Sequence, residues 1–318
     1  MENNQRASAT GSAVGAGIAY MCMGAICMVA LDVAVRTLLE TYELVQVIFL
    51  RSVFAFVLIA LIIVQQRQTS ALRTRQPGWH LFRSLLMTGS IFAFFYALKY
   101  LPLADVIVIA FAAPLIITAM SRPFLGESVG PWRWAAVVAG FVGVLIVVQP
   151  GFGVVHPAAF IALAGAAFYS GLALTARKLA RTESVWSMSL YSFIAPTLIG
   201  GAASFGNWTM PVPVDWLVFA LSGTFGALAF LCVNAAYARA PASIIVPFEY
   251  TGLVWATTAG YLFWDEVPGL NTWFGAAIIV ASGMLILFRE TVARPKADAA
   301  LDFPFQEAVC VKGPRPDG

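Results

Sequence analysis

Two stretches of the chain repeat one pattern: LKYLPLADVIVIAFAAPLIITAMSRPFLGESVGPWRW at residues 98–134 and YARAPASIIVPFEYTGLVWATTAGYLFWDEVPGLNTW at residues 237–273. When the two are aligned without a gap, Pro102 of the first copy falls on Pro241 of the second, and apolar residues face apolar residues. The two copies indicate an internal duplication. The rest of the chain is interpreted around this repeat.

The chain is far more apolar than a water-soluble protein. Of its 318 residues, 60% are hydrophobic and 11% are charged, and the mean hydropathy is +0.82. A soluble domain is about half apolar and about a quarter charged, so the excess must be buried against something other than its own core. We therefore predict an integral membrane protein with the lipid bilayer as a partner. No nucleic-acid partner is predicted.

Ten apolar runs are each long enough, at about 20 residues, to cross a bilayer as a helix. The first run is too long for the core of a signal peptide, so it is interpreted as a retained helix. The predicted fold class is an all-α integral membrane protein with ten transmembrane helices. The runs lie at Val14–Val35 and near residues 44–64, 80–98, 103–122, 133–149, 157–176, 186–205, 215–237, 242–263 and 270–288.

Three of these runs contain an internal proline, at Pro114, Pro196 and Pro247. Inside a membrane, neighbouring helices can satisfy the carbonyl group that a proline leaves free. Each proline is therefore expected to kink its helix rather than end it. For Pro114, which aligns with Leu253 of the second copy, a hinge is the functional alternative to a plain kink.

Lysine and arginine are distributed unevenly over the predicted loops. If the N-terminus is cytoplasmic, sixteen of them lie on the cytoplasmic side and only Arg36 and Lys99 on the outer side, as the positive-inside rule requires. The distribution inverts between the two halves of the chain, as it must when a five-helix unit is inserted in the opposite direction. Both termini are therefore predicted to be cytoplasmic. The predicted domains are an N-terminal tail at 1–12, two inverted repeats at 13–150 and 157–290, and a disordered C-terminal tail at 291–318.

Few residues are suited to bind a metal or to carry catalysis. The four cysteines form no CxxC pair, and three of them lie inside apolar runs, so they are interpreted as small buried hydrophobic residues. The only histidines are His80 and His156. We predict no disulfide, no metal site, no cofactor and no enzymatic activity.

Three ionisable residues inside apolar runs are candidates for function, because a charge at the centre of a transmembrane helix costs about 2.5–3.5 kcal/mol. Asp32 and Arg51 either neutralise each other as a structural pair or take part in gating or substrate binding. Glu249 follows Pro247 and aligns with Ala110 of the first copy. It is interpreted as a proton or cation site. The alternative is a hydrogen bond to a backbone group that Pro247 leaves free.

Aromatic and amide side chains provide further candidates. Tyr96 belongs to an aromatic group on the third run, and Tyr250 and Trp255 lie on the ninth run. Such rings suit an aromatic or cationic organic solute through stacking or cation–π contacts, although most aromatic residues of such a chain pack or face lipid. Asn234, which aligns with Phe95, is a polar candidate on the eighth run.

Other conspicuous residues have structural interpretations. Glu127 and Glu266 occupy equivalent positions in the two copies, and each is expected to cap the helix that follows it and to anchor it at the interface. Gly143 and Gly223, each with a second glycine three residues away, are expected to let helices pack closely.

Residues 14–290 resemble the drug/metabolite transporter superfamily, EamA type. The resemblance rests on ten apolar runs in two inverted repeats, each with an alanine-rich helix end, a proline, a long apolar helix and a terminal glutamate. The stretch FFYALKYLPLA at 94–104, and PFEYTGLVWA with EVPGLNTWFGAAII in the second half, are similar to the branch that holds S-adenosylmethionine and riboflavin uptake transporters.

This resemblance implies a multi-pass secondary carrier of the bacterial inner membrane, with a cavity lined mainly by the third, fourth, eighth and ninth helices. The expected function is transport of a small planar organic solute by alternating access, driven by protons or by another gradient, with riboflavin and S-adenosylmethionine as leading substrates. The coupling ion stays open. Export of amino acids or drugs is the alternative, and a membrane enzyme or a non-transporting sensor are rival classes. The direction of transport and the oligomeric state stay open. The residues that the resemblance puts near the solute are Tyr96, Phe111, Asn234, Glu249, Tyr250 and Trp255.

Overall fold

The fold is built from helices. The computed structural model describes residues 2–67, 73–125, 130–148, 156–179, 182–237, 239 and 242–293, and these ranges contain thirteen helices and no strand. The all-α prediction is confirmed for this part of the chain. The helices are α1 Glu2–Leu39, α2 Leu44–Gln65, α3 Pro77–Tyr100, α4 Leu103–Ala110, α5 Ala113–Leu125, α6 Pro131–Val148, α7 Ala158–Leu179, α8 Val185–Ser192, α9 Ile194–Ser204, α10 Pro213–Tyr237, α11 Ala242–Glu249, α12 Thr251–Trp264 and α13 Leu270–Ala293.

Within the described ranges, six helical stretches are long and apolar enough to cross a membrane. They lie in α1, α2, α3, the consecutive pair α4 and α5, α7 and α10, and shorter apolar stretches lie in α6 and α13. Large apolar side chains such as Leu61, Leu81 and Leu217 are exposed on these helices. Such a surface is stable against lipid, because lipid tails are as apolar as the side chains.

The helix ends differ from the prediction at both termini. The segment 2–12, predicted to be a separate tail, is helical and continues into the first apolar run, because α1 is one helix from Glu2 to Leu39. At the other terminus α13 continues to Ala293. The remainder of the predicted C-terminal tail, residues 294–318, lies outside the described residues.

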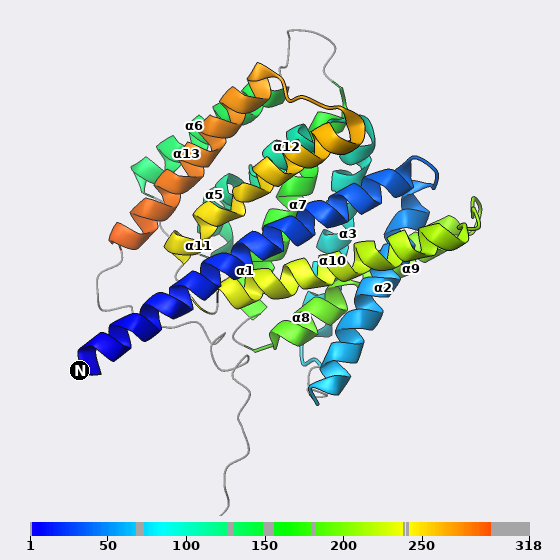
Figure 1. Ribbon diagram of the computed structural model, residues 1–318, viewed down its shortest axis with the longest axis horizontal. Coiled ribbons are helices and arrows are strands. Elements are labelled where there is room, and N and C mark those ends of the chain that lie inside the picture. The colour runs from blue at the N-terminus through cyan, green and yellow to red at the C-terminus, as the bar shows by residue number, and fades with distance from the viewer. Residues whose placement is uncertain are drawn as a thin grey trace, which may run out of the picture.

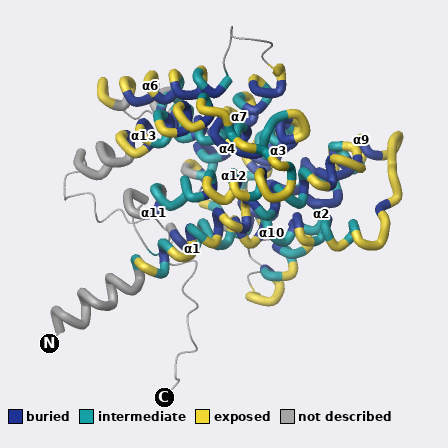
Figure 2. Tube along the Cα trace, turned by 45° about the horizontal axis from the view of Figure 1, so that its top comes forward, coloured by how far each residue is buried: buried dark blue, intermediate teal, exposed yellow. Residues whose placement is uncertain are grey.

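Helices from the first half of the chain pack mainly against helices from the second half. The closest pairs are α1 with α10, α3 with α7, α6 with α13 and α2 with α9, and Figure 1 shows α6 beside α13 and α1 beside α10. Figure 2 shows that buried positions gather where helices face one another. The two halves therefore share one core, in which Val35, Leu98 and Ile109 are almost fully buried.

Glycines allow the close crossings of α6 with α13 and of α10 with α2. A Cβ atom on Gly143 of α6 would lie 2.9 Å from the carbonyl oxygen of Gly275 on α13, and one on Gly275 would lie 2.7 Å from that of Gly143. A Cβ on Gly223 of α10 would lie 2.6 Å from the Cβ of Phe54 on α2. The prediction that Gly143 and Gly223 permit close packing is confirmed.

A serine on α3 bridges the break between α8 and α9. Pro196 has no N–H to donate to the carbonyl of Ser192 four residues earlier, and α8 ends at Ser192. The hydroxyl of Ser84 donates to this carbonyl at 3.1 Å. The hydroxyl oxygen of Ser84 also accepts a hydrogen bond of 2.7 Å from the N–H of Ala195. A neighbouring helix thus satisfies the backbone groups that the break leaves free.

The break between α4 and α5 also contacts a serine of a neighbouring helix. Phe111 and Ala112 separate the two helices just before Pro114, and the hydroxyl of Ser170 on α7 donates to the carbonyl of Ala113 at 3.1 Å. In the third broken run the proline lies before the break and not after it. Pro247 lies inside α11, and the helix ends two residues later, at Glu249.

We predict that Ser84→Ala lowers the free energy of unfolding by about 1–3 kcal/mol, because it leaves a buried carbonyl and a buried N–H without a partner. The measurement is reversible unfolding of the detergent-purified protein. The matched control is Ser90→Ala on the same helix. An equal effect of the two substitutions would contradict the bridging role of Ser84.

Candidate functional site

Two broken helices meet in the middle of the bundle. Phe111 lies between α4 and α5, and Tyr250 lies between α11 and α12. Their ring centroids are 5.0 Å apart and the rings are nearly perpendicular. The two residues occupy equivalent positions in the two copies of the repeated sequence. The hydroxyl of Tyr250 lies against Gly283 of α13, where any larger residue would overlap it.

Glu249 lies next to this aromatic contact, at the last residue of α11. Its carboxylate is within electrostatic reach of the hydroxyls of Tyr250 and of Tyr169 on α7. Tyr169 is in turn within reach of Arg83, a buried residue of α3 that donates a hydrogen bond of 2.8 Å to the carbonyl of Leu172. Tyr169 thus lies in the electrostatic field of an acidic residue and a basic residue on different helices.

The alternative interpretation of Glu249 is a hydrogen bond to a backbone group that Pro247 leaves free. Among the described residues, no hydrogen bond joins the Glu249 carboxylate to a backbone group near Pro247 or elsewhere. Arg83 and Tyr169 were not among the predicted site residues. Arg83 is placed near the end of an apolar run, where an arginine is ordinarily assigned to the membrane surface.

Asp32 and Arg51 form a second buried group. They are 3% and 5% exposed, and they lie within electrostatic reach of each other, although no ion pair joins them in the described part of the chain. The Arg51 guanidinium lies 5.0 Å from the ring centroid of Phe95 on α3. Tyr96 is the predicted site residue on α3, but the ring that faces Arg51 is that of the preceding residue, Phe95.

The other predicted site residues are not brought together with these groups. Tyr96 is partly exposed and packs against Tyr100, whose ring stacks on His156. Trp255 is 41% exposed on α12. The side chain of Asn234 lies outside the part of the chain that the structure describes.

An ion pair closes one end of the bundle. Arg36 of α1 donates two hydrogen bonds to the Glu266 carboxylate, one of them 2.7 Å long, and its guanidinium lies 4.3 Å from the ring centroid of Trp264. Glu266 also accepts a hydrogen bond of 3.2 Å from the N–H of Leu103, the first residue of α4. The sequence predicts that Glu266 caps the helix after it. It caps α4 instead, because α4 packs against α12.

Further polar contacts lie at the same end, and we call the whole group, with Arg36 and Glu266, the Arg36 cluster. Tyr42 donates a hydrogen bond from its hydroxyl to the carboxylate of Asp215 at the start of α10. Gln46 and Thr209 exchange two hydrogen bonds, of 2.6 and 3.0 Å. These contacts join the loop after α1 to the start of α10, and the first turn of α2 to the segment before α10. In each contact, one residue comes from the first half of the chain and the other from the second half.

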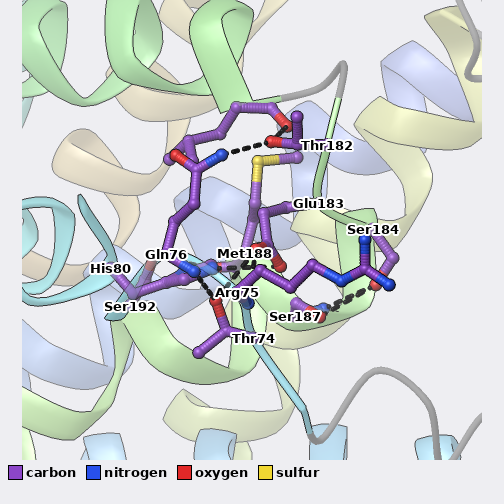
Figure 3. A network of polar contacts seen from close by, with 11 residues as sticks. Thr74, Arg75, Gln76, His80, Thr182, Glu183, Ser184, Ser187, Met188 and Ser192 are labelled. Atoms are coloured by element: carbon purple, nitrogen blue, oxygen red, sulfur yellow. Dashed lines mark hydrogen bonds and ion pairs between the residues drawn. The ribbon is translucent and has the colours of Figure 1, made fainter. Parts of the chain in front are cut away.

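A second polar group closes the opposite end of the bundle. The length of α2, about 33 Å, separates the two ends. Glu183 accepts hydrogen bonds from the Thr74 hydroxyl at 2.9 Å and from the Arg75 N–H at 3.1 Å. The Nε2 atom of His80 lies 3.4 Å from the other carboxylate oxygen, and this contact is an ion pair when the ring is protonated. Gln76 donates to Thr182 at 2.9 Å. Figure 3 shows this group, which we call the Glu183 cluster.

Two cavities accompany these features. One of about 130 Å³ lies at the Glu183 cluster and is lined by polar side chains, including Arg73, Arg75 and Ser184. The other, of about 300 Å³, lies between α3, α5 and α7 and is lined by apolar residues such as Phe82, Met120 and Phe168. Within the described ranges, no three His, Cys, Asp or Glu side chains lie together as a metal site requires.

Comparison with known proteins gives consistent matches along the whole helical part of the chain. The model of the EamA-like transporter family matches residues 15–149 and again residues 156–288. The "Riboflavin transporter" of Vibrio cholerae is 34% identical over 223 residues, which are 70% of this chain and 75% of that protein. The "Riboflavin transporter" of Rhizobium johnstonii is 30% identical over 86% of this chain and 91% of its own.

Relatives with another substrate in their name match over a similar length. The "S-adenosylmethionine uptake transporter" of Rickettsia bellii is 26% identical over 88% of this chain and 96% of its own. One solved crystal structure matches with a TM-score of 0.62 at 20% identity, over 90% of this chain and 99% of its own. At that identity the likeness shows the fold alone.

We predict that Arg36 and Glu266 are energetically coupled by about 1–3 kcal/mol in a double-mutant cycle, because each substitution alone leaves a partly buried charge without its partner. The variants are Arg36→Gln, Glu266→Gln and the double substitution, and the measurement is the free energy of unfolding. Asp265→Asn, at the adjacent exposed position, is the control. Additive effects of the two single substitutions would show that the ion pair does not hold this end.

The Glu183 cluster is expected to depend on pH. Burial acts to raise the pKa of Glu183, but the hydrogen bonds from Thr74 and Arg75 and the nearby His80 ring outweigh it and lower the pKa below its usual range. A lowered pKa in the folded state adds stability above the unfolded pKa of about 4.3, and this stability is lost as the pH falls through the folded pKa. Glu183→Gln should therefore destabilise the protein at neutral pH, and the difference should shrink in this acidic window.

The measurement is the unfolding midpoint of both proteins from pH 3 to pH 7. Glu43→Gln, at an exposed residue of the opposite end, is the matched control and should show no such trend. A difference between Glu183→Gln and the unchanged protein that stays constant with pH would exclude the titration of Glu183 as its cause.

Proposed function

Because the chain belongs to the EamA-like transporter family, we propose that it is a secondary active transporter that moves a small organic metabolite across the bacterial inner membrane by alternating access. Relatives with riboflavin or S-adenosylmethionine in their names match most of its length, which favours solutes of these two kinds. Export of amino acids or drugs is the alternative. A membrane enzyme is the rival class, and the names of the family and of the relatives favour a transporter.

The proposed architecture is ten transmembrane spans in two inverted five-helix repeats, at 13–150 and 157–290, with both termini in the cytoplasm. Each broken run counts as one span: α4 with α5, α8 with α9, and α11 with α12. The packing supports this proposal, because α1 on α10 and α7 on α3 are equivalent contacts when the two repeats are exchanged. The two separate matches to the family model support it as well.

The observation that carries the proposed mechanism is the contact of Phe111 with Tyr250. Broken helices near the middle of the membrane are where carriers with inverted repeats bind their solutes, since the breaks expose backbone groups and side chains to the cavity. Here both breaks occur at equivalent positions and bring an aromatic ring to the same place, beside Glu249. Flat rings at this position suit a planar solute.

The two polar clusters are the proposed gates. Under the proposed orientation, the Arg36 cluster lies at the outer end and the Glu183 cluster at the cytoplasmic end. Each joins the first repeat to the second by hydrogen bonds that exchange with water when that end opens, so the free-energy difference between the two states stays small. Pro114 and Pro247 are the proposed hinges, and Tyr96, Asn234 and Trp255 stay predicted contributors to the solute cavity.

We expect Glu249→Gln to abolish or uncouple transport while the protein remains folded, because the amide cannot exchange the proton that the carboxyl group carries. The measurement is uptake of radiolabelled riboflavin and S-adenosylmethionine into proteoliposomes with an imposed pH gradient. Glu43→Gln is the control for removal of a carboxylate outside the site. Normal gradient-dependent uptake by Glu249→Gln would exclude Glu249 as the coupling residue. Absence of uptake by the unchanged protein, for these and for amino acids, would contradict the transporter proposal.

A further inference from the structure

The buried guanidinium of Arg51 lacks partners that a buried charge ordinarily has, and within the described ranges the carboxyl group of Asp32 forms no ion pair with it. A charge inside an apolar protein is stable only when it is paired or hydrogen-bonded. Asp32 is 3% exposed and Arg51 is 5% exposed, and no ion pair joins them in the described ranges. Nε and Nη1 of Arg51 are buried and have no hydrogen-bond partner. Two opposite charges thus lie near each other without neutralising each other directly.

Another buried arginine of the same protein shows the contrast. Nη1 of Arg83 on α3 donates to the carbonyl of Leu172 at 2.8 Å and to the hydroxyl of Thr175 at 3.3 Å. The chain therefore provides protein acceptors for Nη1 of Arg83, although its Nε is buried without one. Nη1 of Arg51 has no such acceptor, although α1, α2, α3 and α10 surround the side chain.

The surroundings of Arg51 hold the guanidinium in place without using its donors. The Phe95 ring lies 5.0 Å away and attracts the guanidinium through a cation–π contact. On the other side, Gly226 of α10 faces Nη2, and a Cβ atom there would lie 3.2 Å from it. Neither Phe95 nor the Cα of Gly226 offers a hydrogen-bond acceptor. The free donors are left for another molecule.

We propose that Asp32 and Arg51 bind the α-amino-carboxylate head of a zwitterionic solute, whose carboxylate accepts hydrogen bonds from Arg51 and whose ammonium group donates to Asp32. This inference rests on the proposed function and narrows its substrate class. A solute with an amino-acid head, such as S-adenosylmethionine, fits the pair. Riboflavin carries neither charge.

Electroneutrality favours a zwitterion over a simple ion. An anion would pair with Arg51 but would leave Asp32 next to a second negative charge in apolar surroundings. A cation would pair with Asp32 and repel Arg51. A zwitterionic head supplies one partner to each residue and adds no net charge to the buried site, so both burial costs fall together.

The test compares ligands that differ only in the amino-acid head. S-Adenosylhomocysteine and 5′-methylthioadenosine share the adenosine and the thioether, and only the first carries the α-amino-carboxylate. Binding of both, together with S-adenosylmethionine and riboflavin, is measured on the full-length protein in detergent by calorimetry. We expect the two compounds with the head to bind at least tenfold more tightly than 5′-methylthioadenosine and riboflavin.

The variants assign this preference to the two residues. Arg51→Gln and Asp32→Asn should each weaken binding of S-adenosylhomocysteine at least tenfold, and should bring it close to that of 5′-methylthioadenosine. Lys99→Gln, an exposed residue near the same end of the bundle, is the control and should change nothing. If Arg51→Gln does not fold, Arg51→Lys keeps the positive charge but loses the planar fork of donors, and should weaken binding of the same ligand.

Three results would overturn the inference. These are equal binding of 5′-methylthioadenosine and S-adenosylhomocysteine, unchanged binding in both Arg51→Gln and Asp32→Asn, and no binding of either compound that carries the head. Uptake of riboflavin by proteoliposomes in any of these cases would leave the proposed function standing. Its failure is seen separately, as the absence of uptake of every solute.

Discussion

The structure depends on one constraint: a helix inside an apolar bundle can be interrupted only where a neighbour satisfies the backbone groups that the interruption frees. Ser84 does this at the break before Pro196, with one oxygen that donates to a carbonyl and accepts from an N–H. At the break before α5, the hydroxyl of Ser170 on α7 donates to the carbonyl of Ala113. Because these serines lie on α3 and α7, which pack against each other, the breaks are held within the same core. The broken helices are therefore ordered, and they bring the rings of Phe111 and Tyr250 into contact.

The polar residues divide into two kinds by whether the protein satisfies them. At the two ends, Arg36 and Glu183 are bound by several partners from distant parts of the chain. In the interior, Arg51 keeps donors without acceptors. In a membrane protein, unpaired buried charge is costly and is kept where it serves function. The satisfied groups are suited to hold the ends closed, and the unsatisfied group is suited to bind a solute. The same division separates the gates from the proposed site.

Much of this arrangement could be predicted from the sequence. The apolar runs specify the helices, and Asp32 and Arg51 stand out because ionisable residues are rare in such runs. Pro114 and Pro196 are expected to kink their helices, but in the structure one helix ends and another begins just before each of them. What periodicity cannot supply is the partner of each side chain. Arg36 meets Glu266 across 230 positions of sequence, and the composition near either residue carries no sign of the other. Likewise, which ring of the Phe95–Tyr96 pair faces Arg51 is decided by the rotation of α3 against its neighbours.

The most direct measurement of alternating access is transport with one end of the bundle locked at a time. After replacement of the native cysteines, Cys22, Cys27, Cys232 and Cys310, one cysteine pair replaces Arg36 and Glu266, and in a second protein another pair replaces Thr74 and Glu183. Each pair is joined by a short cleavable cross-linker, and uptake into proteoliposomes is measured before cross-linking, after it and after cleavage. If access alternates between the two ends, a cross-link at either end alone stops uptake, and cleavage of the cross-link restores it. Uptake that continues with one end locked would contradict alternating access through these two ends.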